Sequence, residues 1–307
     1  MTTTVERPVA PAPAPRRRTP GVGAGTGALN ILNGTFLLVW GLLTTLPLLW
    51  AIVSSFKTNR EFLSSPWGLP SVARFENFAR AWTTANIGQY FVNSLIVVVI
   101  SVPLTMLLGA MAAYVLSRYS FPGNRVIYYA FVGGLIFPVF LALVPLFFVV
   151  RNLGTLPVVG QFLGLNSHLS LALVYVAFSM PFTVFFLTAF FRTQPTSIAE
   201  AAIVDGCSHF GLFFRVMLPM AKPGLISVGL FNVLGHWNQY VLPVVLMNEP
   251  DKKVLAQGLA SLAISQGYRG DWTALFAGLV IALLPVLIVY VLFQKQVQAG
   301  LTAGVLK

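Results

Sequence analysis

The segment at residues 200–219 carries the densest chemistry in this sequence. It reads EAAIVDGCSHFGLFFRVMLP and places two carboxylates, an imidazole and a guanidinium between two long apolar runs. Such groups transfer protons or bind metals, so catalysis and metal binding are the first functions to consider. The three histidines are scattered and Cys207 is the single cysteine, which leaves no metal-ligand spacing and excludes an internal disulfide. Walker A and G-x-S-x-G motifs are also missing, so we expect no ATP site and no enzymatic activity on this chain.

A second polar cluster lies at residues 231–243, which read FNVLGHWNQYVLP. Its members are spaced by three and four residues, which predicts one helical face made of Asn232, His236, Gln239, Tyr240 and Pro243. Polar groups in a membrane helix normally face the bundle interior. There they can line a path for a solute or form hydrogen bonds with other helices, and the sequence leaves both alternatives open.

Membrane helices are the elements that must position both clusters. The chain is 57% hydrophobic and only 9% charged, whereas soluble domains average about 25% charged residues. Six apolar runs contain no Asp, Glu, Lys or Arg, at residues 30–53, 91–116, 127–150, 169–191, 223–247 and 273–293. Each has the roughly 20 residues that a helix needs to cross about 30 Å of hydrocarbon. We therefore expect an all-α integral membrane protein with six transmembrane helices, in one domain covering residues 29–307.

The first 28 residues are rich in Pro, Ala, Gly and Arg and have no apolar periodicity, which predicts a disordered tail at residues 1–28. A signal peptide is the alternative, but the run at 30–53 is longer than an h-region of about 7–15 residues. With the tail inside, the inner segments hold more Lys and Arg than the outer ones, and this predicts that both termini face the cytosol. The basic residues form no single stripe, so we expect no nucleic-acid partner.

Prolines within the spans predict bent helices, which suit a transporter better than a simple anchor. They are Pro47, Pro103, Pro138, Pro145, Pro181, Pro243 and Pro285. The outer segment at residues 54–90 is long enough either to meet another molecule or to pack on its own bundle. Within it, Pro66, Trp67 and Pro70 separate two partly helical pieces.

The polar segment itself predicts two short helices. Ser197 and Glu200 have the spacing of a capping box, and Gly206 is placed to end the helix that follows. A second helix is expected over residues 208–217, closed by Pro219. One face of this helix holds large apolar side chains, Phe210, Phe213, Phe214 and Met217. Such a face needs a partner protein, the chain's own bundle or the lipid interface, and the sequence does not decide among them.

This segment resembles the EAA loop of bacterial ABC-importer permeases, whose pattern is EAA, three residues, G, nine residues, I, one residue, LP. Only Val216 departs from that pattern. The flanking sequence is similar to the sugar-importer branch, in particular the maltose-type second permease subunit. The similar positions are Asn93-Ser94, Arg118 with Phe121-Pro122-Gly123, Pro181-Phe182, Asp205-Gly206, Trp237-Asn238 and the terminal Gly300-Leu301-Thr302-Ala303-Gly304. The resemblance covers roughly residues 50–307 and implies the type I ABC importer permease fold, with the loop folded as a coupling helix pair.

The resemblance also implies residue roles and partners. Contacts with a cytosolic ATPase carry over to Glu200, Ala201, Ala202, Asp205, Gly206, Leu218 and Pro219. The implied partners are a second permease subunit, two ATP-binding subunits that hold ATP and Mg²⁺, and an extracytoplasmic sugar-binding protein, with membrane lipid around the helices. No cofactor or metal is expected on this chain.

The expected cargo is a neutral mono- or oligosaccharide, because the spans carry no charge. The expected substrate path consists of Asn232, His236, Trp237, Gln239 and Tyr240. Chitobiose or N-acetylglucosamine is the first candidate, since the Ala-, Pro- and Arg-rich tail resembles those of actinobacteria, in which such importers are common. The outer segment 54–90 is a candidate contact for the binding protein. An ion-coupled secondary transporter or a channel subunit is the alternative, although carriers usually place carboxylates or lysines inside their spans.

Overall fold

The structure is a computed structural model that describes residues 24–303, and for residues 24–28, 266–269 and 295–303 it describes the backbone alone. The described chain is helical, without β-strands. In chain order the elements are α1 (Ala24–Ser54), α2 (Asn59–Ser64), α3 (Glu76–Thr83), α4 (Ile87–Arg118), α5 (Asn124–Ile136), α6 (Val139–Leu153), η1 (Val159–Gln161), α7 (His168–Thr193), α8 (Thr196–Val204), α9 (His209–Gly211), the π-helical turn η2 (Leu212–Met217), α10 (Leu218–Met220), α11 (Lys222–Trp237), α12 (Val241–Leu246), η3 (Pro250–Lys252), α13 (Leu255–Arg269) and α14 (Trp272–Ala303).

The chain divides into two units, residues 1–50 and residues 51–307. The first unit contains most of α1, which begins at Ala24, before the expected tail boundary at residue 28. Residues 1–23 of that expected tail lie outside the described residues. Gly304, the last residue of the motif Gly300-Leu301-Thr302-Ala303-Gly304, also lies outside the described residues.

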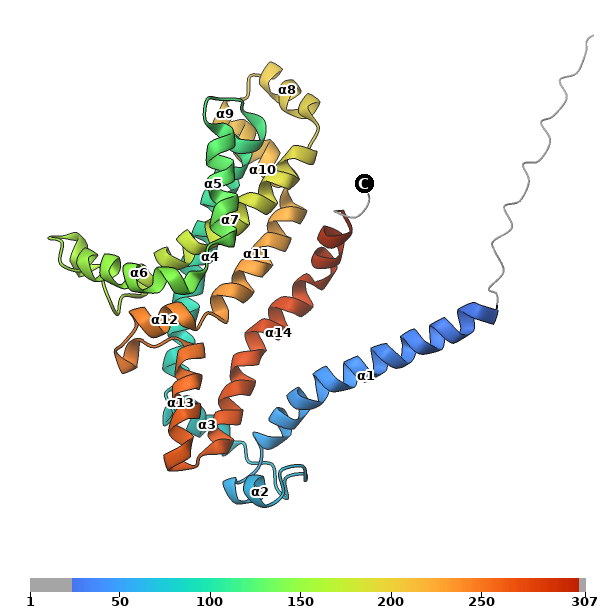
Figure 1. The fold of residues 1–307 in the computed structure, drawn as a ribbon, viewed down its shortest axis with the longest axis vertical. Coiled ribbons are helices and arrows are strands. Elements are labelled where there is room, and N and C mark those ends of the chain that lie inside the picture. The colour runs from blue at the N-terminus through green and yellow to red at the C-terminus, as the bar shows by residue number, and fades with distance from the viewer. Residues whose placement is uncertain (1–23, 304–307) are drawn as a thin grey trace, which may run out of the picture. The chain divides into compact units, whose positions relative to one another are not determined.

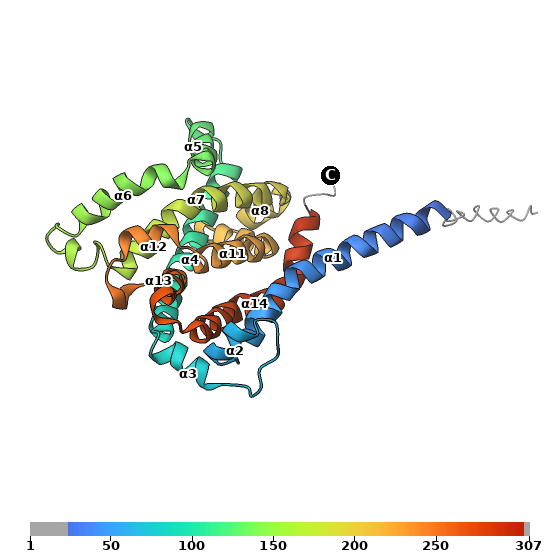
Figure 2. The same cartoon turned by 60° about the horizontal axis from the view of Figure 1, so that its bottom comes forward.

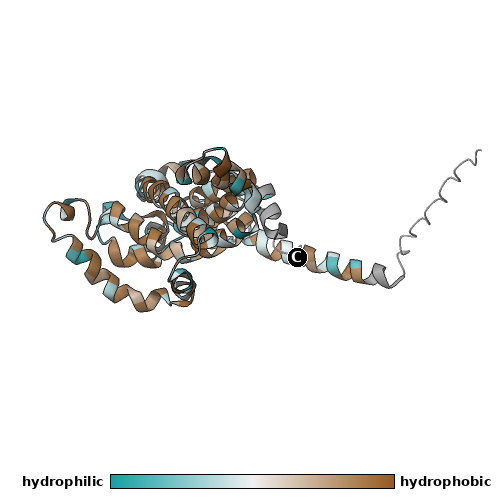
Figure 3. Cartoon of the chain, turned by 90° about the horizontal axis from the view of Figure 1, so that it is seen from above, coloured by the Kyte–Doolittle hydropathy of each residue, from teal (hydrophilic) through white to brown (hydrophobic). Residues whose placement is uncertain are grey.

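Four helices are long and apolar enough to cross a membrane, over Leu29–Ser54, Ile87–Arg118, His168–Thr193 and Trp272–Gln294. Two further candidates are bent pairs: α5 with α6, at 104°, and His209–Met220 with α11, at 77°. Most of the ribbon in Figure 3 carries apolar residues, as a membrane protein requires. By length and composition, the described chain thus has four candidate spans, or up to six if each bent pair is one span.

Two of the expected spans are not continuous helices, and both contain prolines at which the sequence predicts bends. Within residues 127–150, α5 ends at Ile136 because Phe137 and Pro138 adopt extended backbone (ψ 121° and 120°), and proline disfavours helix in the residue before it. Within residues 223–247, α11 ends at Trp237 and α12 begins at Val241. The side-chain oxygen of Gln239 accepts hydrogen bonds from the backbone N–H groups of Tyr240 (3.1 Å) and Val241 (3.3 Å), which satisfies the start of α12.

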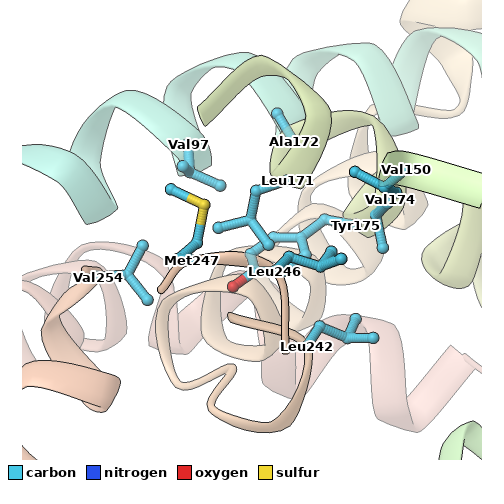
Figure 4. Close-up of a cluster of buried hydrophobic side chains, with 10 residues drawn as sticks. All are labelled: Val97, Val150, Leu171, Ala172, Val174, Tyr175, Leu242, Leu246, Met247 and Val254. Atoms are coloured by element: carbon cyan, nitrogen blue, oxygen red, sulfur yellow. The ribbon is translucent and has the colours of Figure 1, made fainter. Parts of the chain in front are cut away.

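Helices α4 and α7 form the most extensive helix pair in the second unit. They approach closely at Gly109, where a Cβ atom would lie 2.4 Å from Cγ2 of Thr183. Beside this pair, side chains from α7 and α12 meet Val97 of α4 in the apolar cluster drawn in Figure 4. A second cluster, which includes Phe191 and Met217, lies where α4 and α7 meet the polar segment.

The outer segment contains the two helical pieces expected from its prolines, α2 and α3. Arg80 of α3 donates to Asp271, just before α14, from Nε to Oδ2 at 2.8 Å and from Nη2 to Oδ1 at 3.1 Å. Burial raises the pKa of Asp271, but the hydrogen bonds and the charge of Arg80 outweigh burial and hold this pKa below its usual value. Lys57 is fully buried and donates to the carbonyls of Ser65 (3.2 Å) and Pro66 (2.7 Å). Part of the outer segment therefore packs on its own bundle.

Figures 1 and 2 show how the elements of the second unit are arranged. Helices α8 and α9 lie at one end of the bundle, and α2, α3 and α13 lie at the opposite end (Figure 1). Helix α6 turns from the direction of α5 at the bend (Figure 2), and its Val150 lies in the same apolar cluster as Val174 of α7. The polar segment and the outer segment are therefore at opposite ends of the spans.

Candidate functional site

The polar loop, defined as residues 196–220, begins with α8. This helix starts at Thr196 after Pro195, and no side chain caps it. The predicted capping box between Ser197 and Glu200 is therefore wrong, because the helix begins early enough to place Ser197 inside its first turn. At the other end, the N–H of Gly206 donates to the carbonyl of Ile203 at 2.9 Å. Gly206 has φ +81°, a left-handed conformation that glycine adopts at low cost, so α8 ends where the sequence predicted.

The second half of the loop is not the single α-helix expected for residues 208–217. Ser208 caps α9 by accepting from the N–H of Gly211 at 3.2 Å, and the chain then enters the π-helical turn η2. Pro219 lies inside α10 and does not close the helix. Because a π turn has more residues per turn than an α-helix, side chains three residues apart diverge while those four apart stay aligned.

This turn divides the apolar face that the sequence predicted. Phe213 and Met217 are buried in the cluster formed with Tyr114 and Phe191. Phe210 and Phe214 stay exposed, with 73% and 44% of their surface accessible. Half of the face therefore packs on the chain's own bundle, and half remains available to a partner or to lipid.

The loop residues named from the sequence also divide by exposure. Glu200, Ala201, Asp205, Gly206 and Pro219 are exposed, whereas Ala202 and Leu218 are half-buried against the bundle. Two apolar side chains of α8 are exposed as well: Ile203 is 50% accessible and Val204 is 87% accessible. The outward surface of α8 thus combines one carboxylate with several apolar groups.

Hydrogen bonds connect the loop to the ends of α4 and α7. Nη2 of Arg118 donates to the carbonyl of Gln194 at 2.5 Å, and Nε2 of Gln194 donates to the carbonyl of Met217 at 3.1 Å. The hydroxyl of Tyr119 lies 3.1 Å from Nδ1 of His209, and the two rings are edge to face. A displacement of the loop must therefore move the ends of these two helices or break these bonds.

The second polar cluster borders a cavity of about 340 Å³ between α7 and α11. Of the residues expected on the substrate path, Asn232, His236 and Gln239 line it. Tyr175, Ser179 and Phe182 of α7 form the facing wall. No Asp, Glu, Lys or Arg is among the lining residues, so the cavity suits a neutral solute.

The polar residues of the cavity also connect three helices. Nδ1 of His236 lies 2.7 Å from the hydroxyl of Ser101 on α4, and Nε2 lies 2.7 Å from the hydroxyl of Ser179 on α7. Asn232 donates from Nδ2 to Oγ1 of Thr183 at 2.9 Å. The ring of Tyr175 packs on His236 with centroids 5.1 Å apart. These side chains therefore bond other helices and border the cavity at once.

The expected single face from Asn232 to Pro243 does not exist, because α11 stops at Trp237. Trp237 is buried on another side of the helix, where Nε1 donates to the carbonyl of Ala282 at 3.2 Å and the ring meets Phe91 edge to face. Tyr240 and Pro243 are not among the residues that line the cavity.

Sequence reasoning missed the residues that α7 contributes. Tyr175, Ser179 and Thr183 are spaced by four residues, so they form a polar stripe on one side of an apolar helix. This four-residue spacing is the sequence pattern from which their place on one side of α7 could have been predicted. Within the described residues, His, Cys, Asp and Glu form no group that could hold a metal ion.

Comparison with known proteins finds a transport family and two permeases of bacterial transporters. Residues 105–302 match the family described as "Binding-protein-dependent transport system inner membrane component". The chain is 51% identical to the diacetylchitobiose uptake system permease protein NgcG of Streptomyces coelicolor, over 89% of this chain and 87% of that protein. It is 33% identical to the probable ABC transporter permease protein YurM of Bacillus subtilis, over 89% of this chain and 87% of that protein.

A solved structure shares the fold. It is a bacterial ABC transporter involved in the import of the acidic polysaccharide alginate, and it superposes with a TM-score of 0.73 at 22% identity. The match covers 90% of this chain and 99% of the other.

Proposed function

The chain belongs to the family of binding-protein-dependent transport system inner membrane components, and on this premise we propose that it is the permease subunit of an ATP-driven importer for a neutral oligosaccharide. The observation that carries the proposal is the polar loop. It presents Glu200, Ala201 and Gly206 at one end of the bundle and is bonded to α4 and α7.

We propose that this loop docks on an ATP-binding subunit. Support comes from the exposed apolar side chains of Ile203 and Val204, which a partner's groove would cover. In this proposal Glu200, Ala201, Asp205, Gly206 and Pro219 meet the ATPase, while Ala202 and Leu218 fix the loop to the bundle. ATP and Mg²⁺ bind to the partner, and closure of two ATPases moves the loop and the helices bonded to it. The loop acts by binding differently to the two states.

The full assembly we propose contains a second permease subunit, two ATP-binding subunits and an extracytoplasmic sugar-binding protein. Both termini face the cytosol in this arrangement, and the polar loop lies on the cytosolic side with the outer segment 54–90 opposite. Trp67, Leu69 and Phe75 of that segment are exposed apolar side chains, which supports a contact with the binding protein.

We propose diacetylchitobiose as the first candidate cargo. The 51% identity to a diacetylchitobiose uptake permease supports this choice. The cavity supports it chemically, because Gln239, Ser179 and Asn232 offer amide and hydroxyl groups that suit hydroxyl and acetamido groups. Aromatic side chains of Tyr175 and Phe182 can cover an apolar ring face. In this proposal Trp237 does not contact the sugar. It holds α11 against α14 through its hydrogen bond to the carbonyl of Ala282.

The coupling role is tested by changing Gly206. Replacing it with Val places a β-branched residue at φ +81°, a conformation that strongly disfavours such residues, and so alters the turn after α8. We expect ATP-dependent uptake of labelled diacetylchitobiose to fall about tenfold or more, the equivalent of about 1.4 kcal/mol in coupling. Glu200→Gln is expected to act in the same direction. Uptake is measured in cells that express the complete transporter and lack other routes for this sugar, with membrane abundance followed in parallel.

The matched control is Glu249→Gln, which removes an exposed carboxylate outside the polar loop and should leave uptake unchanged. Uptake that persists at the original rate in Gly206→Val and Glu200→Gln, at equal abundance, would contradict the coupling role.

The cargo path is tested by Gln239→Ala. Loss of one bonding group to a sugar should cost about 0.5–1.5 kcal/mol, so the ratio of uptake rates for diacetylchitobiose, cellobiose and maltose should shift about two- to tenfold. The control is Asn238→Ala, since Asn238 is the neighbouring amide, is exposed and does not line the cavity. Identical kinetics for all three sugars in Gln239→Ala and wild type would remove Gln239 from the path.

A further inference from the structure

Two adjoining hollows lie at the end of the bundle that carries the polar loop. The first, of about 540 Å³, is lined mainly by apolar and aromatic side chains, among them Met111 and Val115 of α4 and Phe210 and Phe213 of the loop. The second, of about 470 Å³, is formed by residues between Leu116 and Val126, in the connection from α4 to α5. Tyr119, Ser120 and Phe121 line both hollows, so together they form one surface with an apolar part and a polar part.

The polar part is positively charged. Arg118 and Arg125 line it, and neither forms an ion pair with a described residue. Nε of Arg118 is buried and has no hydrogen-bond partner within the described chain. The sequence contains no Asp or Glu between Glu76 and Glu200, so this connection has no acid of its own to neutralise the arginines.

The start of α5 adds to this potential. Gly123 precedes it with φ +89°, and no side chain caps the helix, which is 13 residues long. The first N–H groups of α5 therefore present the positive end of a helix dipole beside the two arginines.

The connection also lies where two candidate membrane-spanning segments end and begin. The connection joins the end of one membrane-spanning helix to the start of the next, and Tyr119, Tyr128 and Tyr129 lie beside it. Tyrosines are enriched at this level of membrane proteins. From the apolar hollow, exposed side chains continue along α4 toward the middle of the span, at Leu107, Leu108 and Met111. A chain of methylene groups could follow this row of residues.

We propose that the two hollows together bind one anionic phospholipid. Its phosphate lies beside Arg118 and Arg125, and one acyl chain passes Val115 and Met111, against Phe210. A free phosphate ion would use the cationic part alone, and a neutral lipid would leave both arginines without an anion. The amphipathic form of the surface is what favours a phospholipid. Binding requires neither ATP nor sugar, so this proposal is tested separately from the transport proposed above.

The experiment measures lipid retained by the full chain, purified with its associated subunits and placed in nanodiscs of phosphatidylcholine with phosphatidylglycerol. Native mass spectrometry then compares wild type with Arg125→Gln, which removes the headgroup charge, and Val115→Trp, which fills the apolar hollow. We expect each variant to retain about fivefold less phosphatidylglycerol, the equivalent of about 1 kcal/mol for one basic residue at an anionic membrane. Arg125→Lys should retain it like wild type.

The matched control is Arg151→Gln, which removes an exposed arginine from the far end of α6 and should not change retention. Thermal unfolding identifies any variant that fails to fold, and Arg125→Lys and Val115→Trp still test the site if Arg125→Gln is lost. Equal retention by wild type, Arg125→Gln and Val115→Trp overturns the proposal. Displacement of the lipid by millimolar inorganic phosphate would indicate a free-anion site and overturn it too, as would equal retention of phosphatidylcholine or coverage of the surface by a copurified subunit.

Discussion

Two segments of this chain share the spacing of a capping box and differ in structure. Thr58 and Glu61 form the box at α2: the hydroxyl of Thr58 accepts from the N–H of Glu61 at 3.2 Å, and Oε2 of Glu61 accepts from the N–H of Thr58 at 2.8 Å. Ser197 and Glu200 do not form it, because α8 begins at Thr196. A motif of four residues cannot specify where a helix starts when the preceding proline already fixes a suitable backbone.

Glu61 gives a pH-dependent prediction at this scale. A hydrogen bond from the Ser71 hydroxyl, together with the backbone N–H groups of Thr58 and Ser71, lowers its pKa from 4.5 to about 2. A carboxylate with a lowered folded-state pKa stabilises the fold above its unfolded value and loses that contribution as pH falls through the folded value. We expect Glu61→Gln to lower the Tm at pH 7, and this difference from wild type to shrink between pH 4.5 and about 2.

The measurement is thermal unfolding of the detergent-solubilised protein across that pH range. Glu76→Gln is the control, since it removes another carboxylate of the outer segment, one that forms an ion pair with the exposed Arg74 at 3.4 Å. A Tm difference for Glu61→Gln that stays constant down to pH 2 would disprove the role assigned to this carboxylate.

The cavity residues show what sequence can find at the residue scale. Asn232, His236 and Gln239 stood out because amides and imidazole are rare in a span. Ser101, Ser179 and Thr183 did not stand out, since single hydroxyls are common in membrane helices and need only a nearby carbonyl. Their role depends on meeting His236 and Asn232 from two other helices, which no local pattern records.

At the scale of elements, the existence of apolar helices was predictable, but which of the prolines would break a helix was not. Composition alone predicts the spans, because each long apolar run must satisfy its backbone in lipid. Prolines do not behave uniformly, however. Pro103, Pro145, Pro181 and Pro285 lie inside continuous helices, while the chain breaks at Pro138. Whether a proline bends or ends a helix depends on the neighbours that satisfy the freed carbonyl groups.

The π-helical turn is a second feature that periodicity could not find. Counting by three and four residues placed Phe210, Phe213, Phe214 and Met217 on one face because it assumed a regular α-helix. The turn instead buries one pair and exposes the other. Of the face that the sequence predicted, one pair of side chains thus packs on the bundle and the other pair is exposed.

Packing of α4 against α7 yields a prediction for Gly109. Its missing Cβ would lie 2.4 Å from a methyl group of buried Thr183, so Gly109→Ala must separate the helices or displace that side chain. We expect a loss of about 1–3 kcal/mol in the free energy of unfolding, seen as a lower Tm.

Gly133→Ala is the matched control on α5, where nothing lies within 4 Å of the added Cβ. It should be neutral or slightly stabilising, because alanine favours a helix interior over glycine. Equal Tm values for Gly109→Ala and Gly133→Ala would show that α4 and α7 do not depend on this close approach.

For the whole molecule, the sequence was sufficient for the family and insufficient for the geometry of the cavity. The EAA spacing is local, so a linear pattern records it completely. The cavity is assembled from α7 and α11, with Ser101 of α4 bonded to its histidine, and these residues are far apart in the chain. Only the packing of the spans brings them together.

The ion pair between Arg80 and Asp271 joins residues 191 positions apart, and this separation has a consequence in time. At about 5–20 residues per second, a ribosome reaches the acid roughly 10–40 s after it has made the arginine. Until then the guanidinium lacks this carboxylate partner, although most of the apolar helices have already been synthesised. A chain truncated before residue 271 can never close this contact. The pair therefore forms only in chains that have been extended beyond residue 271.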